Sequence, residues 1–193
     1  MVSFSDFHTL DPEAPQLARE LLENAERQRS AFMSFVNTWM AFNGWMESVT
    51  DAGTDARMIE AIAENRRLNE AFEALLDGQP AFQRQVVSFA ADWPVINVRD
   101  ARRKLGRDAF FRFERDEFLN ECRRHEVRFQ PAAWVIGEVP TWPQLLRTVY
   151  AVRCNLFHGA KSPQNQRDRD LVRHSDRILR RFIQGSGCLD WHD

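Results

Sequence analysis

The chain of 193 residues has little of several residue types, and each scarcity argues against a class of protein. Only three cysteines are present, an odd and widely spaced set, so the sequence lacks the framework of a disulfide-rich secreted domain. No apolar run reaches the roughly 18 residues that a membrane span requires, and the N-terminus lacks the basic and apolar regions of a secretory signal. We therefore expect a reduced, cytoplasmic protein that does not associate with a membrane.

Glycine and proline are also scarce, at eight residues each, which argues against a loop-rich β architecture. Neither of the glycine-rich loops that cradle nucleotide phosphates occurs, and there is no Gly-x-Ser-x-Gly nucleophile elbow. These absences argue against ATP-dependent and dinucleotide-dependent enzymes of the common types. We predict that the protein uses no cofactor.

Lysine is nearly absent, because 24 of the 26 basic residues are arginine. The planar guanidinium fork suits phosphate and carboxylate groups better than the point charge of lysine does. The net charge of −2 conceals an asymmetry: residues 1–98 carry 7 basic and 15 acidic side chains, whereas residues 147–181 carry 9 basic and 3 acidic ones. This asymmetry indicates an anionic partner for the C-terminal part of the chain.

Hydrophobic side chains that recur at three- and four-residue steps predict helices along most of the chain. We expect an all-α bundle of five or six helices in a single domain that spans residues 1–193, with residues 183–193 as a C-terminal tail. Between 95 and 98 the sequence VINV is compatible with a brief extended segment. The expected helices cover residues 14–46 (with a break near the polar stretch ENAERQRS), 54–76, 81–91, 113–129, 142–158 and 168–184, and Gly185 is expected beyond the end of the last one.

The segment VRCNLFHGAKSP, residues 152–163, places two reactive side chains at the end of a predicted helix. Arg153 and His158 are five positions apart, so on a straight helix their Cβ directions differ by about 140°. A histidine in the last turn before the cap residue Gly159 can nevertheless swing towards a shared site. An imidazole suits acid–base catalysis near neutral pH, and an adjacent arginine would stabilise developing negative charge. Physical reasoning leaves the alternative of an ordinary helix end open.

A zinc site is a second alternative, because each cysteine has a histidine three or four residues behind it. Such spacings place two ligands one helical turn apart. The Cys-x2-Cys knuckles of zinc modules are absent, however, and free cysteines are commonly buried. We therefore predict no metal. The three pairs are Cys122 with His125, Cys154 with His158, and Cys188 with His192.

The chain resembles HEPN domains near both ends. The sequence VRCNLFHGAK, a short polar loop and DRDLVRHSDRILRRFI resemble the end of these helical bundles, whose hallmark is Arg-x(4–6)-His. Residues 34–46, SFVNTWMAFNGWM, resemble the aromatic first long helix of the Apea-like, toxin-type HEPN branch, which contains Trp-x-x-Phe-Asn. Residues 48–141 match only as generic helix.

The resemblance implies a homodimer in which two Arg-x4-His motifs face each other, and a metal-independent endoribonuclease activity. By that analogy His158 acts as general acid or base while the 2′-hydroxyl attacks the adjacent phosphate, and a 2′,3′-cyclic phosphate is formed. Arg153 would position the phosphate and stabilise the transition state. Asn155 would support the phosphate or orient the histidine. We expect the basic residues Arg147 and Lys161 to bind the RNA substrate.

Two departures from the family bear on the activity. A polar residue often follows the arginine directly, whereas Cys154 stands here and the asparagine comes one position later. The branch that accepts nucleotidyl transfer has x-Tyr after its histidine, and this chain has Gly159 and Ala160 instead. Because some HEPN proteins bind without cleaving, the alternative is a non-catalytic module that binds nucleic acid or protein. For the ribonuclease we expect a defence, stress-response or toxin–antitoxin setting, with a possible antitoxin or regulatory protein as partner.

Overall fold

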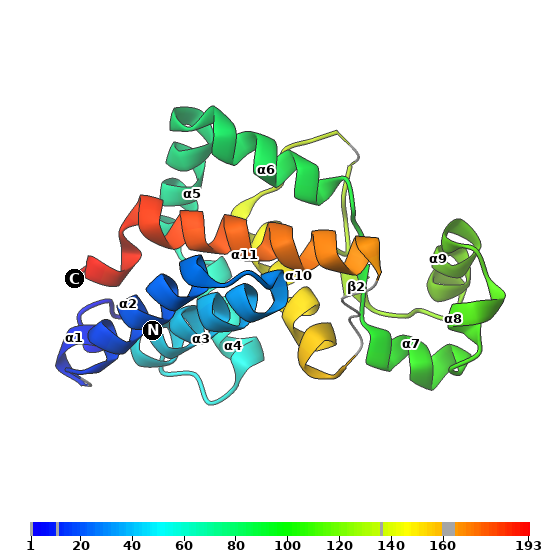
Figure 1. The fold of residues 1–193 in the computed structure, drawn as a ribbon, viewed down its shortest axis with the longest axis horizontal. Helices are drawn as coiled ribbons and strands as arrows, with labels where there is room; N and C mark the ends of the chain where they lie inside the picture. The colour runs from blue at the N-terminus through cyan, green and yellow to red at the C-terminus, as the bar shows by residue number, and fades with distance from the viewer. Residues whose placement is uncertain (1, 11, 136, 160–164) are drawn as a thin grey trace.

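The computed structural model (Figure 1) describes residues 2–10, 12–135, 137–159 and 165–193. The structure is 71% helical, with eleven α-helices and one two-stranded sheet among the described residues, which confirms the all-α class. The helices outnumber the five or six expected, because two long predicted helices are each broken and because three short helices, over residues 6–9, 98–105 and 109–112, were not expected. None of the described helices combines the length and the apolar character needed to cross a membrane.

The first predicted helix is divided into α2 (Ala14–Arg27) and α3 (Ala31–Val49), at the polar stretch where a break was expected. The Ser30 hydroxyl accepts a hydrogen bond from Met33 N at 3.4 Å and so caps α3. Because the break changes the helical phase, one apolar stripe does not continue through both helices. Leu17, which the pattern places on the buried stripe, is 57% exposed.

The predicted helix 54–76 is also two helices, α4 (Asp55–Ala63) and α5 (Arg66–Gly78). Thr54 caps α4 as expected. The prediction of one continuous helix is wrong, because Asn65 has extended backbone and its side chain accepts a hydrogen bond from the backbone of α5. A capping side chain at this point starts a new helix instead of extending the old one.

The last two long helices are α10 (Trp142–Phe157) and α11 (Gln166–Ser186). Gly185, expected beyond the end of α11, lies inside it, and Gly187 ends the helix with a left-handed φ of 63°. The reason is packing: a Cβ added to Gly185 would lie 2.7 Å from Cδ2 of Leu75. This glycine therefore permits a close approach between α11 and α5.

The two ends of the chain pack together. The short helix α1 (Asp6–Thr9) precedes α2, and the 3-10 helix η1 (Cys188–Asp190) follows α11. Beyond η1 the Trp191 ring lies edge-on to the Phe4 ring with 5.1 Å between centroids. Residues 183–193, expected as a tail, thus complete α11 and pack against the N-terminal segment.

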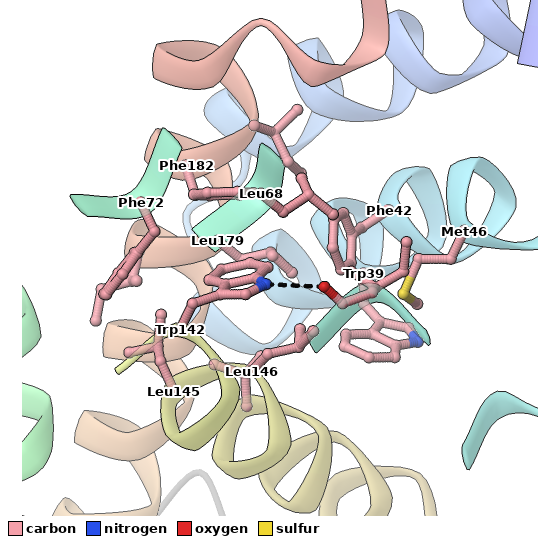
Figure 2. Close-up of a cluster of buried hydrophobic side chains, with 14 of the residues drawn as sticks. Trp39, Phe42, Met46, Leu68, Phe72, Trp142, Leu145, Leu146, Leu179 and Phe182 are labelled. Atoms are coloured by element: carbon pink, nitrogen blue, oxygen red, sulfur yellow. Dashed lines mark hydrogen bonds between the residues drawn. The ribbon is translucent and has the colours of Figure 1, made fainter. Parts of the chain in front are cut away.

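The main hydrophobic core is rich in tryptophan and phenylalanine (Figure 2). Trp142 of α10 stacks on Phe182 of α11 with 4.0 Å between ring centroids, and its ring also lies 5.7 Å from that of Phe72. The indole N–H donates a hydrogen bond to Ile62 O at 3.1 Å, at the C-terminal end of α4. The break between α4 and α5 thereby provides a partner for a fully buried indole. Helix α6 (Pro80–Ala90) packs on α5 and α11.

One buried carboxylate joins α3 to α11. Asp176 is 3% exposed and accepts hydrogen bonds from Thr38 Oγ1 at 2.6 Å and from Ser34 Oγ at 2.8 Å. Arg180, one turn further along α11, lies 3.3 Å from the same carboxylate. A buried charge is tolerated only with such partners, so these contacts fix the register of the two helices.

A smaller helical module, residues 98–128, projects from one side of the bundle (Figure 1). Its core is separate from that of the bundle and consists of Ala101, Ala109, Phe118, Cys122 and Val127. The expected extended segment is strand β1 (Val95–Ile96), which pairs antiparallel with β2 (Phe129–Gln130) at the base of the module. The module contains α7 (Val98–Leu105), α8 (Ala109–Arg112) and α9 (Arg115–Arg124), the last of which is shorter than the helix expected over 113–129.

Candidate functional site

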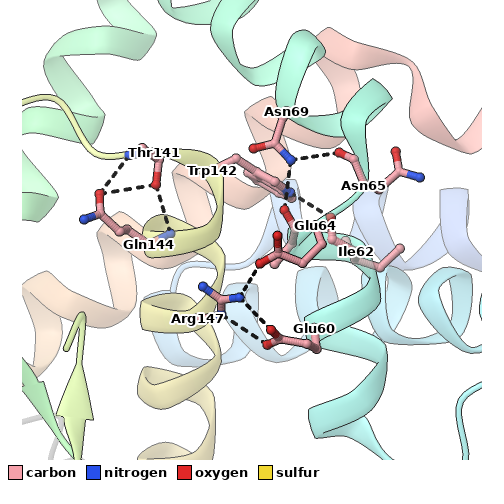
Figure 3. Close-up of polar contacts among 10 residues, drawn as sticks. Glu60, Ile62, Glu64, Asn65, Asn69, Thr141, Trp142, Gln144 and Arg147 are labelled. Carbon is pink, nitrogen blue, oxygen red and sulfur yellow. Dashed lines mark hydrogen bonds and ion pairs between the residues drawn. The ribbon is translucent and has the colours of Figure 1, made fainter. Parts of the chain in front are cut away.

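Helix α10 carries the Arg-x4-His motif and is capped at both ends. At its start Thr141 N donates to Gln144 Oε1 at 3.0 Å, and Thr141 Oγ1 accepts from Gln144 N at 3.5 Å, which forms a capping box (Figure 3). At its end His158 is the C-cap residue, and its N–H bonds Cys154 O at 3.1 Å. Gly159 follows with a left-handed φ of 64°. The predicted position of this helix end is confirmed.

Asn155 attaches the module to α10. It is 4% exposed, and its Oδ1 accepts a hydrogen bond from Val98 N at 3.1 Å. Its Nδ2 donates to Ile96 O at 2.7 Å. The side chain thus bonds the backbone on both sides of the junction between β1 and α7. In this arrangement Asn155 positions α7 beside the end of α10.

Arg153 faces the N-terminal part of the bundle. Its Nη1 lies 3.0 Å from Asp55 Oδ2, at the first residue of α4. The guanidinium carbon lies 4.7 Å from the centroid of the Phe157 ring and 5.5 Å from a Trp39 ring. These contacts hold a side chain that is 22% exposed. Buried Nε has no partner among the described residues.

His158 is exposed and lines a pocket of about 510 Å³ between α10 and the module. We call it the basic pocket, because four arginines and a single acidic residue, Asp100, are in its described lining. Arg153 does not line it, so within one protomer the structure does not bring Arg153 and His158 to the same pocket. Besides Asp100 and His158, the polar side chains of the lining come from α7 and its cap residue, from the residue before β2 and from α10, namely Asn97, Arg99, Arg102, Arg103, Arg128 and Asn155.

Asp100 organises the arginines of the basic pocket. The residue is 2% exposed, and its Oδ2 accepts a hydrogen bond from Arg128 N at 2.9 Å. Its Oδ1 lies 2.7 Å from Arg103 Nη2, and Lys104 Nζ and Arg128 Nε are each 3.7 Å from Oδ2. The backbone hydrogen bond from Arg128, opposed by burial and aided by the neighbouring cations, lowers the pKa of this carboxyl below its usual value. The carboxylate is therefore ionised at neutral pH and links α7 to Arg128, the residue directly before β2.

Arg147, expected to bind substrate, lies outside the basic pocket. Its Nη2 contacts Glu60 Oε1 at 2.9 Å and Glu64 Oε1 at 2.6 Å (Figure 3). These two carboxylates raise the pKa of the guanidinium against the effect of its partial burial. Arg147 lines a neighbouring pocket of about 240 Å³, together with Tyr150, whose pKa burial raises to about 12. Lys161, also expected to bind substrate, lies outside the described residues.

The cysteines do not assemble into a metal site. Among the described residues no three His, Cys, Asp or Glu side chains are close enough to hold a metal ion together. Cys122 lies in the core of the module and Cys188 lies in the core of the bundle, so these two cysteines do not share a site. Burial raises the pKa of the Cys188 thiol to about 12. Cys154 is only partly buried and lies between the two pockets.

The arginines of the basic pocket were not identified from the sequence. The charge count directed attention to residues 147–181, whereas three of these arginines lie on α7. A signal was present in the sequence: Asn97 can cap a helix, and Arg99, Arg102 and Arg103 recur at three- and four-residue steps behind it. That spacing gives α7 one basic face.

Comparisons of the chain with protein-family models, with curated proteins and with solved structures find no match. The resemblance to HEPN domains therefore rests on the motif residues themselves.

Proposed function

We propose that the chain is a HEPN-type, metal-independent endoribonuclease that acts as a homodimer. The observation that carries the proposal is the position of His158, which is exposed at the end of α10 in a pocket lined by four arginines. An imidazole with access to solvent can exchange protons near neutral pH. Guanidinium groups around it favour a substrate that carries phosphate.

The reaction is an intramolecular transesterification. A ribose 2′-oxygen loses its proton and bonds to the adjacent phosphorus, and the bond from phosphorus to the 5′-oxygen of the next nucleotide breaks. The products are a 2′,3′-cyclic phosphate and a 5′-hydroxyl, so water and redox equivalents are not consumed. His158 would take the proton from the 2′-hydroxyl or give one to the leaving 5′-oxygen. The guanidinium of Arg153 would stabilise the extra negative charge of the transition state.

Arg153 would act from the second protomer. In one protomer it faces α4 while His158 faces the module, so a site that contains both needs another copy of α10. Asp55 engages Arg153 through Nη1, which leaves further N–H groups of the guanidinium available as donors. Asp55 would then hold the guanidinium in one orientation while the free donors contact the phosphate.

The test uses purified protein and labelled RNA in buffer with EDTA. Wild type should release fragments with cyclic phosphate ends, and His158→Ala and Arg153→Ala should each lower the rate about 100-fold or more. His125→Ala is the matched control for the first, because His125 is likewise an exposed helix C-cap residue, at the end of α9. Cleavage that survives both site substitutions, or that needs added metal, would contradict the mechanism.

Mixing the two inactive variants tests the homodimer. In a composite site, a heterodimer of Arg153→Ala and His158→Ala subunits contains one site in which both side chains are intact. Activity should therefore reappear in the mixture. If each protomer held its own complete site, no recovery would occur.

One observation favours the non-catalytic alternative, in which the chain binds nucleic acid without cleaving it. The guanidinium of Arg153 is held by Asp55 and packs beside Trp39 and Phe157, as in a purely structural ion pair. This alternative predicts salt-dependent binding of RNA with no strand scission in the same assay.

A further inference from the structure

The face of α7 that borders the basic pocket carries more positive charge than the protein itself neutralises. Four arginines line the pocket, and the one acidic residue in its described lining is Asp100, which is buried beneath them. Asp100 pairs with Arg103 and lies near Arg128. Arg99 makes no hydrogen bond or ion pair through its side chain with any described residue. Because the positive charges that line this pocket repel one another, the pocket favours an anion.

Arg102 connects the pocket to Phe110 of α8. Its guanidinium carbon lies 5.9 Å from the centroid of the Phe110 ring. The next residue, Phe111, is 92% exposed, the most exposed large hydrophobic side chain among those described. A phenylalanine this exposed, next in sequence to the Phe110 ring that Arg102 contacts, has no role in the core of the module. It can act as a surface on which a planar group stacks.

Guanidinium groups and an exposed aromatic ring on one small module are a combination that suits single-stranded nucleic acid. Arginines follow the phosphate backbone, and the ring stacks on a base whose face is free. A duplex hides the faces of its bases and is a rigid rod, so it does not enter a concave pocket of about 510 Å³. The pocket volume lies within the range of sites for nucleotide-sized ligands.

We propose that the module of residues 98–128 binds single-stranded RNA, with phosphates against Arg99 and Arg102 and a base on Phe111. The inference rests on the proposed function, because the bound strand is the substrate that reaches His158. The structural reason is the anchoring of the module: Asn155 ties the start of α7 to α10 three residues before His158. A strand held on the basic face of α7 therefore continues directly to the imidazole.

The experiment measures binding without cleavage. Fluorescence anisotropy with a labelled RNA of about 12 nucleotides, in single-stranded and in duplex form, is recorded on His158→Ala protein so that the probe stays intact. The single strand should bind at least about tenfold more tightly than the duplex. The logarithm of its affinity should fall with the logarithm of salt concentration, by about 0.7 per phosphate contact.

Substitutions on this background locate the site. The pair Arg99→Ala and Arg102→Ala should weaken binding about tenfold or more and reduce the salt slope by about 1.4. Phe111→Ala should weaken binding at least about fivefold with an unchanged salt slope, because stacking releases no counterions. Arg84→Ala, which removes an exposed arginine of α6 remote from the module, is the control and should change neither quantity.

Changing Arg99 and Arg102 to lysine shows that a loss of binding reflects charge and not unfolding, because the charge and hence the salt slope should be retained. Equal affinity for duplex and single strand, or equal effects of the α7 pair and of Arg84→Ala, would overturn the inference. The two proposals can fail separately. If RNA binds through Arg99 and Arg102 but wild type does not cleave it, the inference stands and the proposed function fails. If wild type cleaves RNA and the rate does not change when Arg99 and Arg102 are substituted, the proposed function stands and the inference fails.

Discussion

The substitution Asp100→Asn removes one negative charge and keeps the shape of the side chain, so it isolates what this buried carboxylate contributes. The amide oxygen can still accept the hydrogen bond from Arg128 N, 2.9 Å away in the wild-type structure. Hydrogen bonds to a charged group are worth about 1.5–3 kcal/mol and neutral ones about 1 kcal/mol, so the exchange costs about 1–2 kcal/mol. The ion pair with Arg103 adds only a few tenths, because that side chain is 73% exposed. We expect a total loss of about 2 kcal/mol in the local stability of the module.

Hydrogen exchange of residues 98–128, read by mass spectrometry, measures this local stability without assuming that the whole chain unfolds in one step. A loss of about 2 kcal/mol should accelerate exchange in this segment about 30-fold at neutral pH and leave α3 unchanged. Asp108→Asn is the control, because Asp108 is exposed and its side chain makes no cap hydrogen bond at α8.

The pH dependence provides the refuting result. The pKa of folded Asp100 is lowered from 3.8, so its stabilisation is complete above 3.8 and is lost as the pH falls through the lower folded value. The ratio of variant to wild-type exchange rates should therefore approach one in acid. A ratio that is as large in acid as at neutral pH would show that the variant acts through shape and not through charge.

Two further predictions concern the packing of the cysteines and of two helical glycines. Of the three thiols, Cys154 alone should react rapidly with a disulfide reagent in the folded protein, because the other two are buried; three equally fast thiols would contradict the packing. Gly44→Ala, on the exposed side of α3, should raise the free energy of unfolding by about 0.5–1 kcal/mol in urea titrations. Gly185→Ala should raise the free energy of unfolding by less than Gly44→Ala does, since the added Cβ would lie 2.7 Å from Leu75. An equal gain from both would contradict the close approach of α11 and α5.

The helices themselves could be predicted because their apolar spacing is regular. Leu171, Ile178 and Leu179 of α11 are buried as their spacing requires. The break at Asn65 was missed because the apolar pattern continues on both sides of it, and a single asparagine does not show whether its side chain caps or faces solvent. Gly185 was misplaced for a related reason. A glycine near a helix end predicts a cap, but here a distant helix determines its position.

The site could be predicted only in part, because its surroundings come from segments far apart in the sequence. The end of α10 at His158 follows from Gly159, a purely local signal. By contrast, the ion pair of Arg153 joins it to Asp55, almost a hundred residues earlier, and nothing in either local sequence indicates the partner. The role of Asn155 could not be predicted either, since both of its hydrogen bonds go to backbone groups, which every residue has, and so no sequence signal marks the partners.

The five-residue spacing of Arg153 and His158 places these two side chains on different sides of α10, where they have different surroundings. Arg153 takes its partner, Asp55, from the bundle, whereas His158 takes its surroundings from the module. A change at Asp55 should therefore disturb the guanidinium without altering the arginines of α7, and a change on α7 should do the reverse. If the proposed function is right, the first kind of change lowers the rate of cleavage at saturating RNA and the second raises the RNA concentration that saturation requires. Under the proposed function, chemistry and substrate capture are therefore separable by substitution.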